Sequence, residues 1–305
     1  MVETISKVFS SLPLPDLRDF KVIAEPEGER EGFWVGGCSS LKDKKGKIWL
    51  AYRMRDPERR GHALHIVSSS DGINFEKVCE LKKEDFNCVS LERAALLQDP
   101  VTEKYKLYVS LEKEGKWFIY KLKDVLSPKE FDPLTAYPVF LPSYKREDSR
   151  KVKDPYIINF LNRWWMFYSG SGKEPQEELY LATSEDGEIW EYKGRILQRK
   201  FWHNHHTRIS CIFPTDKGFV IFYEGSSSSW YEPHFNLNIG FAYTQDMQNF
   251  FDLTTKKPLL SSPTRGKFCT IRYMDYVLLD KKIIFYYEAA REDGAFELRA
   301  SWYEK

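Results

Sequence analysis

Four acidic residues that lie far apart in the sequence are the candidates for acid–base chemistry: Glu92, Asp154, Glu224 and Glu288. Two carboxyl groups can share such work if one environment keeps a proton near neutral pH and the other loses it. Cations accompany the acids, and these are Arg53, Arg93, Lys153, Arg208 and Arg272. Buried charges are costly unless they are paired, so a cluster of both signs often marks a functional site.

A sequence repeat indicates which elements would bring these residues together. Asp71 and Asp186 each occupy an Asp-Gly turn that ends a β-rich run and is followed by an aromatic residue. Weaker copies of the turn contain Asp124 and Asp246, so the mean spacing is about 58 residues. Five such units would fill nearly all of the 305 residues.

Each unit contains short runs rich in β-branched and aromatic residues. Clear examples are residues 47–52, 62–67, 164–168, 178–183, 219–223 and 237–242. Turn residues separate the runs, which is typical of antiparallel strands. Four-stranded antiparallel sheets repeated around an axis form a β-propeller. We therefore expect an all-β fold, specifically a five-bladed β-propeller, rather than an array of unrelated hairpins.

The expected propeller is a single domain spanning residues 1–305. Its blades would cover about residues 31–85, 86–145, 146–200, 201–262, and 263–305 together with 18–25. The fifth unit has only three strands of its own. An uncovered sheet edge is an aggregation hazard, so we expect the N-terminal segment 19–24 to close the last blade.

The propeller geometry predicts which side chains share one opening of the central channel. The innermost strand of each blade starts at that opening and the second strand ends there. The first group contributes Trp34, Glu92, Arg93, Lys153, Asp154, His205, His206, Arg208 and Arg272, and the second contributes Arg53, Glu224 and Glu288. The alternative is that some of these charges form structural ion pairs between blades.

Composition narrows the possible partners and compartment. The 46 Lys and Arg residues nearly balance the 45 Asp and Glu residues, so neither nucleic acid nor an anionic membrane is expected as the main partner. No stretch approaches the roughly 20 apolar residues of a membrane span, and the N-terminus does not read as a secretory signal. Five scattered cysteines suggest a reducing compartment. We expect a cytoplasmic protein, with its oligomeric state left open.

Two motifs resemble a known group of enzymes. Lys153-Asp154-Pro155-Tyr156 resembles an element of the five-bladed propeller glycosidases of glycoside hydrolase family 43, and Glu224-Gly225 followed by His234 is similar to another of its blades. Tyr52-Arg53 with the turn at Asp71 also resembles family 130, which includes mannoside phosphorylases and hydrolases. The resemblance implies a glycosidase that cleaves a glycosidic bond in a small oligosaccharide or glycoside.

The sequence departs from the family 43 pattern at two of its three catalytic acids. The first inner strand, residues 34–38, contains no acid, and the position of the family's glutamate acid falls in residues 206–208. Asp154 matches the third acid, which orients substrate and tunes the acid. Glu92 and Glu224 are therefore the predicted acid and base.

The other residues of the opening are predicted to bind substrate: Trp34, Arg53, Arg93, Lys153, His205, His206, Arg208, Arg272 and Glu288. Two alternatives to hydrolysis stay open. One is an inverting glycoside phosphorylase, in which the cations would hold phosphate, and the other is a non-catalytic sugar-binding propeller. A protein-interaction scaffold fits the polar opening less well.

The histidines raise the question of a metal ion. His203, His205, His206 and His234 are four of the six histidines, and imidazole is a common metal ligand. The cysteines do not join them at a zinc-finger spacing. The resemblance implies a possible central calcium or other metal ion near His205 or His206. We assign no metal ligand and expect no certain cofactor, because such histidines also bind sugar hydroxyls.

Overall fold

The computed structural model of the chain describes residues 12–304, and most of these residues lie in strands. The helical residues of this part form three short 3-10 turns: η1 (Pro128–Glu130), η2 (Pro133–Thr135) and η3 (Phe201–His203). The expected all-β class is therefore confirmed. None of the helices between residues 12 and 304 is long and apolar enough to cross a membrane.

The strands pair with their sequence neighbours in successive antiparallel groups. The first group is β2 (Trp34–Lys42), β3 (Ile48–Arg55), β4 (Ala63–Ser69) and β5 (Glu76–Lys82). The second is β6 (Ser90–Gln98), β7 (Tyr105–Lys113), β8 (Lys116–Lys121) and β9 (Tyr137–Phe140). The third is β10 (Lys151–Phe160), β11 (Arg163–Ser171), β12 (Glu178–Ser184) and β13 (Glu191–Arg195).

The last two groups continue this order, and the final one recruits the N-terminal segment. The fourth group is β14 (His206–Thr215), β15 (Gly218–Ser226), β16 (Asn238–Thr244) and β17 (Phe251–Asp252). The fifth is β18 (Ile271–Leu278), β19 (Lys282–Ala290) and β20 (Phe296–Glu304). Strand β1 (Lys21–Ala24) pairs antiparallel with β20, and the Ser301 hydroxyl donates to the Asp19 carbonyl at 2.9 Å. The N-terminal segment thus occupies the sheet edge where we expect it.

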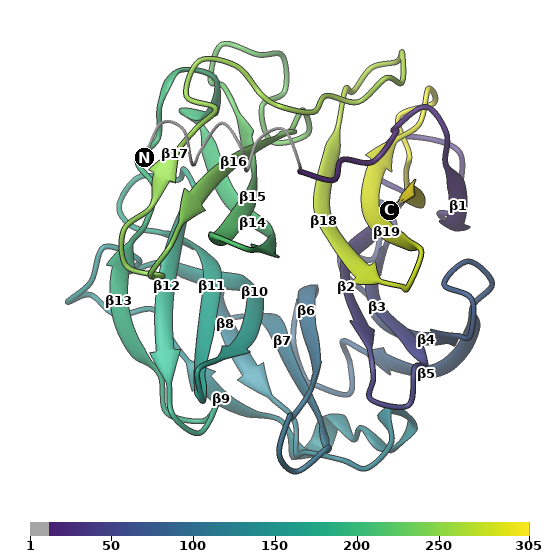
Figure 1. The fold of residues 1–305 in the computed structure, drawn as a ribbon, viewed down its shortest axis with the longest axis vertical. Coiled ribbons are helices and arrows are strands. Elements are labelled where there is room, and N and C mark those ends of the chain that lie inside the picture. The colour runs from purple at the N-terminus through teal and green to yellow at the C-terminus, as the bar shows by residue number, and fades with distance from the viewer. Residues whose placement is uncertain (1–11, 305) are drawn as a thin grey trace.

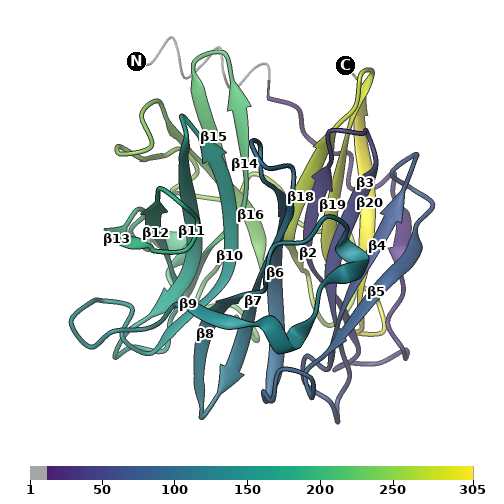
Figure 2. The ribbon, with the colours of Figure 1, turned by 90° about the horizontal axis from the view of Figure 1, so that it is seen from below.

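The groups are arranged around a common centre (Figures 1 and 2). The first strand of each group, which is β2, β6, β10, β14 or β18, contacts the first strand of the next, and β18 contacts β2 in turn. Single parallel pairings at Trp34–Phe296, Lys151–Trp117 and Glu177–His206 join neighbouring groups. The starts of distant strands are thereby brought together.

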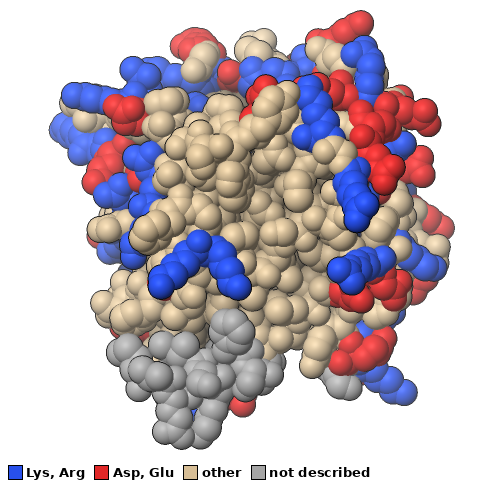
Figure 3. All heavy atoms as spheres, turned by 90° about the horizontal axis from the view of Figure 1, so that it is seen from above, with Lys and Arg blue, Asp and Glu red and all other residues tan. Residues whose placement is uncertain are grey.

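The core lies between adjacent groups. One cluster combines Trp49 and Ile66 of the first group with Leu96 and Leu107 of the second, and all four side chains are buried. Successive side chains of a strand point to opposite faces of its sheet. Because the sheets pack against neighbours on both faces, most strands are buried on both sides. Charged side chains of both signs are left mainly at the rim of the face shown in Figure 3.

The Asp-led turns of the repeat share one geometry in three of the four copies. Asp71, Asp186 and Asp246 each accept hydrogen bonds from the backbone N–H groups two and three residues later. Asp124 instead forms ion pairs with Lys106 and Lys121. The weak copy at Asp124 therefore occupies the expected place in the chain with different chemistry.

Every first strand contains a register shift at an equivalent place. The shifts fall between residues 36 and 39, 91 and 94, 153 and 156, 209 and 211, and 272 and 275. Backbone φ is positive at Gly37 (+63°), Asp154 (+54°) and Tyr273 (+52°) within these segments. A bulge re-aims side chains and changes their alternation, so polar residues can face the centre before the apolar pattern resumes.

Candidate active site

Near the starts of the first strands, nine charged side chains form two neighbouring clusters of ion pairs, which together make the central network. The first cluster joins Glu288 to Arg53, Arg272 and Glu92, and the second joins Glu177 to Lys153, Asp154, Arg208 and Glu224. The anchor of the first cluster is Glu288, which is fully buried. The Glu288 carboxylate accepts hydrogen bonds from Arg53 Nη2 at 3.1 Å, Arg272 Nε at 2.9 Å and the Gly37 backbone N–H at 3.0 Å. Because these bonds compensate the burial of three charges, Glu288 positions the two arginines.

Glu92 extends this network toward solvent. Its carboxylate Oε2 lies 3.2 Å from Arg53 Nε, and its side chain is 11% exposed whereas that of Arg53 is 1% exposed. Burial alone would raise the pKa of Glu92, but attraction by Arg53, Lys153 and Arg55 outweighs it and lowers the pKa to about 2. Glu92 is therefore ionised at neutral pH.

Lys153 and Asp154 lie beside Glu177. Lys153 Nζ is 3.0 Å from Asp154 Oδ2 and 3.3 Å from Glu177 Oε1. Asp154 adopts the left-handed backbone region, and its N–H donates to the Ser110 hydroxyl at 2.8 Å. This conformation costs about 1 kcal/mol or more and tends to occur at functional sites. Asp154 Oδ1 is buried and has no hydrogen-bond partner in residues 12–304.

Arg208 joins Glu177 to Glu224. Its Nη1 lies 3.2 Å from Glu177 Oε2, and its Nη2 lies 2.5 Å from Glu224 Oε1. The other Glu224 oxygen accepts the Tyr273 backbone N–H. Burial raises the pKa of Glu224, and Arg208 only partly offsets that increase. The pKa values of Glu92 and Glu224 therefore move in opposite directions, as a general acid and its partner require.

Two residues of this region were missed from the sequence. Glu177 lies between Lys153 and Arg208, which hold its pKa well below the ordinary value against the effect of burial. It belongs to a polar segment before β12, residues 173–177, where no pattern distinguishes it from a solvated glutamate. Arg55 stacks over the Trp34 ring at 4.1 Å, and burial lowers its pKa to about 10.

Four predicted substrate-binding residues lie outside the ion-pair network, and two of them, Arg93 and Trp34, are held by the framework of the fold. Arg93 is fully buried, and it donates to the backbone carbonyl oxygens of Cys38, Ile209 and Ser210 at 2.8–3.1 Å. It therefore ties three strands together. Trp34 is 5% exposed, and its ring contacts arginine guanidinium groups and two phenylalanine rings. Little of the indole is left for stacking on a ligand.

Three of the histidines gather at the edge of the network, whereas His203 does not join them. The rings of His205, His206 and His234 have centroids 4.4–5.0 Å apart. Burial lowers the pKa of each, so they are neutral at neutral pH. His203 Nε2 instead lies 3.1 Å from Asp252 Oδ2 and is fully buried.

The histidine cluster does not fit the calcium ion that the resemblance implies. Calcium prefers oxygen ligands, and this donor set is three imidazoles whose nitrogens come within 4.8 Å of one another. His206 Nδ1 accepts the Glu177 backbone N–H at 3.2 Å, and its Nε2 lies 3.0 Å from His234 Nδ1. Because Nδ1 is an acceptor, Nε2 carries the proton and donates to His234. Both His206 nitrogens are therefore engaged.

Comparison with known proteins identifies similar folds. No family model matches the chain, and no curated protein matches it significantly. A structure described as a glycoside hydrolase has a TM-score of 0.79 at 12% identity, covering 100% of this chain and 96% of its own. The β-1,2-mannobiose phosphorylase from Listeria innocua has a TM-score of 0.65 at 13% identity, covering 92% of each chain. The α-L-arabinofuranosidase from Lactobacillus brevis has a TM-score of 0.67 at 9% identity, covering 87% and 89%.

These likenesses confirm, for the fold, the resemblance to propeller glycosidases. They extend over nearly the whole of each chain, so the fold is shared from end to end. Identities of 9–13% are too low to transfer residue roles, and one fold can host many activities. A function is therefore inferred from the side chains of the central network.

Proposed function

We propose that the protein is a glycoside hydrolase that cleaves a glycosidic bond in a small oligosaccharide or glycoside. The observation that carries the proposal is the placement of Glu92, Asp154 and Glu224 in two neighbouring ion-pair clusters, with the pKa values of Glu92 and Glu224 moved in opposite directions. In the proposed architecture, the described residues 12–304 form one five-bladed propeller, and each antiparallel group is a blade; the ends of the expected domain 1–305 lie outside the described residues. The neighbours of similar fold, described as glycosidases and phosphorylases, support this assignment.

The proposed roles follow from the environments of the three acids. Glu224, whose pKa is raised by burial, would hold the proton that the leaving oxygen receives. Glu92, which is ionised and the most exposed acid of the three, would activate water or stabilise positive charge on the sugar. Asp154 would orient the substrate with its free oxygen, and the neutral histidines would bind hydroxyl groups.

The pairing of the cations favours hydrolysis over phosphorolysis. Arg53, Lys153, Arg208 and Arg272 each contact a carboxylate already, so they are poorly placed to hold a phosphate nucleophile. Arg55 has no carboxylate within 4 Å among the described residues, and it is the cation through which a phosphorylase activity would act. The five cysteines are free, which supports the further proposal of a cytoplasmic enzyme.

Kinetic tests of two conservative variants address the proposal. Wild-type protein is assayed on a panel of aryl glycosides and small oligosaccharides, with and without inorganic phosphate. We expect turnover that does not depend on phosphate. Glu92→Gln and Glu224→Gln should each lower kcat by about 100-fold or more, since general acid–base catalysis typically contributes 10²–10⁴-fold.

A control variant separates catalysis from surface charge. Glu232→Gln changes an exposed acid in the loop next to His234, and it should retain wild-type turnover. Phosphate-dependent turnover would identify a phosphorylase instead. Saturable sugar binding by calorimetry without turnover on any substrate would identify the non-catalytic alternative. The absence of both binding and turnover would contradict the carbohydrate assignment.

A further inference from the structure

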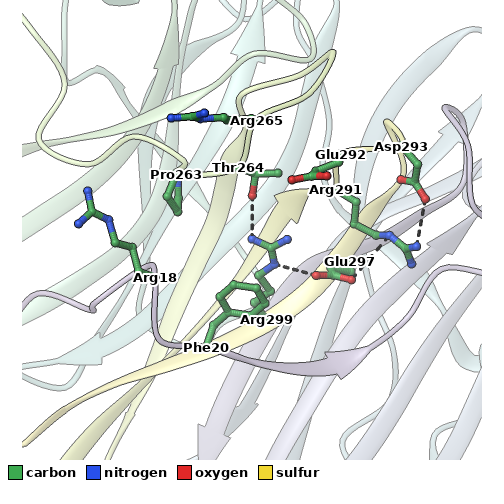
Figure 4. Close-up of a pocket in the computed structure, with 10 residues that line it drawn as sticks. All are labelled: Arg18, Phe20, Pro263, Thr264, Arg265, Arg291, Glu292, Asp293, Glu297 and Arg299. Carbon is green, nitrogen blue, oxygen red and sulfur yellow. Dashed lines mark hydrogen bonds and ion pairs between the residues drawn. The ribbon is translucent and has the colours of Figure 1, made fainter.

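An open cavity lies where the N-terminal segment meets the last sheet. Its volume is about 620 Å³, and no residue of the central ion-pair network lines it. Figure 4 shows the lining, in which Arg18 and Phe20 precede β1 and the rest belong to the loop before β18 or to the β19–β20 hairpin. The lining residues are Arg18, Phe20, Pro263, Thr264, Arg265, Arg291, Glu292, Asp293, Glu297 and Arg299.

One side of the cavity is a fixed wall. Arg299 is 4% exposed; its Nε donates to Glu297 at 2.8 Å and its Nη1 to the Thr264 hydroxyl at 3.1 Å. The guanidinium also stacks on the Phe20 ring at 4.0 Å. Arg291 pairs with Asp293 at 3.0 Å and approaches Glu297 at 4.0 Å. Glu297 and Asp293 are therefore already neutralised by protein cations.

The remaining cations of the lining are Arg18 and Arg265. Both side chains are exposed, and within residues 12–304 no carboxylate pairs with either guanidinium. Figure 4 shows these two groups on the side of the cavity away from Asp293, with no interaction drawn to them. The lining carries four guanidinium groups and three carboxylates, so it has an excess of positive charge although the chain is nearly neutral.

We propose that this cavity binds a small ligand through an oxyanion, either a phosphate or a carboxylate group. Arginine is suited to this role because its planar donors match both oxyanions in a bidentate manner. Arg18 and Arg265 would contact the anion, and the buried Arg299 would form the floor behind it. Glu292, on the same rim, would weaken the binding through like-charge repulsion.

Because of the position of the cavity, a bound ligand would also stabilise the pairing of β1 with β20. Arg18 belongs to the segment that leads into β1, whereas Arg265 leads into β18. A ligand held by both would bridge the N-terminal segment and the last sheet. A ligand that binds only the folded state stabilises it by mass action, so the bound anion would also hold β1 against β20.

Calorimetry and hydrogen exchange test this proposal. The full-length protein is titrated with inorganic phosphate, with glucuronate and with glucose, at constant ionic strength set by chloride. We expect saturable binding of phosphate or glucuronate and none of glucose, and the stronger of the two anions identifies the oxyanion. Binding should slow amide exchange in residues 21–24.

Substitutions in the lining of the cavity test whether the anion binds there. Arg18→Ala with Arg265→Ala should weaken binding at least tenfold, and Glu292→Gln should strengthen it. Lys104→Ala, which removes an exposed cation from the β6–β7 turn, should leave it unchanged. The proposal is overturned if neither anion binds, or if the double variant binds like the wild type, which would place the anion elsewhere, including at the central network.

Discussion

Glu92 is the acid of the central network that combines solvent contact with close cations. Its pKa falls to about 2, against an ordinary value of 4.5, because Arg53, Lys153 and Arg55 outweigh the effect of burial. A carboxyl group with a lowered folded-state pKa stabilises the protein above its unfolded pKa. That contribution is lost as the pH falls toward the folded value.

The pH dependence of unfolding measures this contribution. The stabilisation lost by Glu92→Gln should be about 3 kcal/mol at pH 7 and about half of that at pH 3, because the ionised form of Glu92 is being removed. Urea unfolding at several pH values gives the difference between wild type and variant. Glu76→Gln changes an exposed carboxylate and should give a difference near zero throughout. A Glu92 difference that does not change between pH 7 and pH 3 would contradict the assigned ion pairs.

The sequence alone predicted most residues of the central network but not all of them. It identified Glu92, Asp154, Glu224 and Glu288 because each lies at a strand end set by the repeat. Glu177 lies in a loop. Because charged residues are common in surface loops, a glutamate there does not indicate a functional site.

The register shift in each first strand could not be located from the sequence alone. Alternation along a strand assigns side chains to faces only where the register is uninterrupted, and each first strand has a register shift. The shift between Leu91 and Ala94 falls at Arg93, which bonds to backbone carbonyls and does not join the predicted cluster. The strands themselves were predictable from β-branched and aromatic runs, since those runs pack between sheets.

Gly36 in β2 allows the central network to form. A Cβ atom at this position would lie 2.0 Å from Glu288 Oε2, so Gly36→Ala must displace the carboxylate that holds Arg53 and Arg272. Breaking a buried ion pair costs about 3–5 kcal/mol, and we expect a loss of about 3 kcal/mol in chemical denaturation.

Gly46→Ala is the matched control for this prediction. Gly46 has a φ of +83°, and no neighbouring atom lies within 4 Å of the position that a Cβ atom would take there. The variant should therefore lose only about 1 kcal/mol through backbone strain. Equal losses in the two variants would show that the carboxylate is not held as closely as described.

The pairing of β1 with β20 affects the whole molecule, because it joins the two ends of the described chain in one sheet. The repeat predicted this pairing, since the last unit lacked a strand. The repeat could not predict the cavity beside it, because its two unpaired cations, Arg18 and Arg265, come from segments outside the repeated strands.

Deletion of residues 1–24 removes β1 and uncovers the edge of β20. We expect the Tm to fall by several degrees, because strand pairing and the packing of Leu17, Ile23 and Ala24 are lost. We also expect concentration-dependent self-association through the open edge. Calorimetry and light scattering measure the two effects. Lys21→Ala keeps the backbone pairing and should show neither, whereas an unchanged Tm in the deletion would mean that β1 contributes nothing to the fold.

The contact between Asp19 and Ser301 also has a consequence for the order of events during biosynthesis, because the two residues are 282 positions apart. While the nascent chain leaves the ribosome, residues 21–24 have no partner until the last strand has been translated. Contacts at such sequence separation form slowly. The pairing of β1 with β20 is therefore expected to form late in folding, and until then a chaperone that shields extended segments would have its longest opportunity to bind.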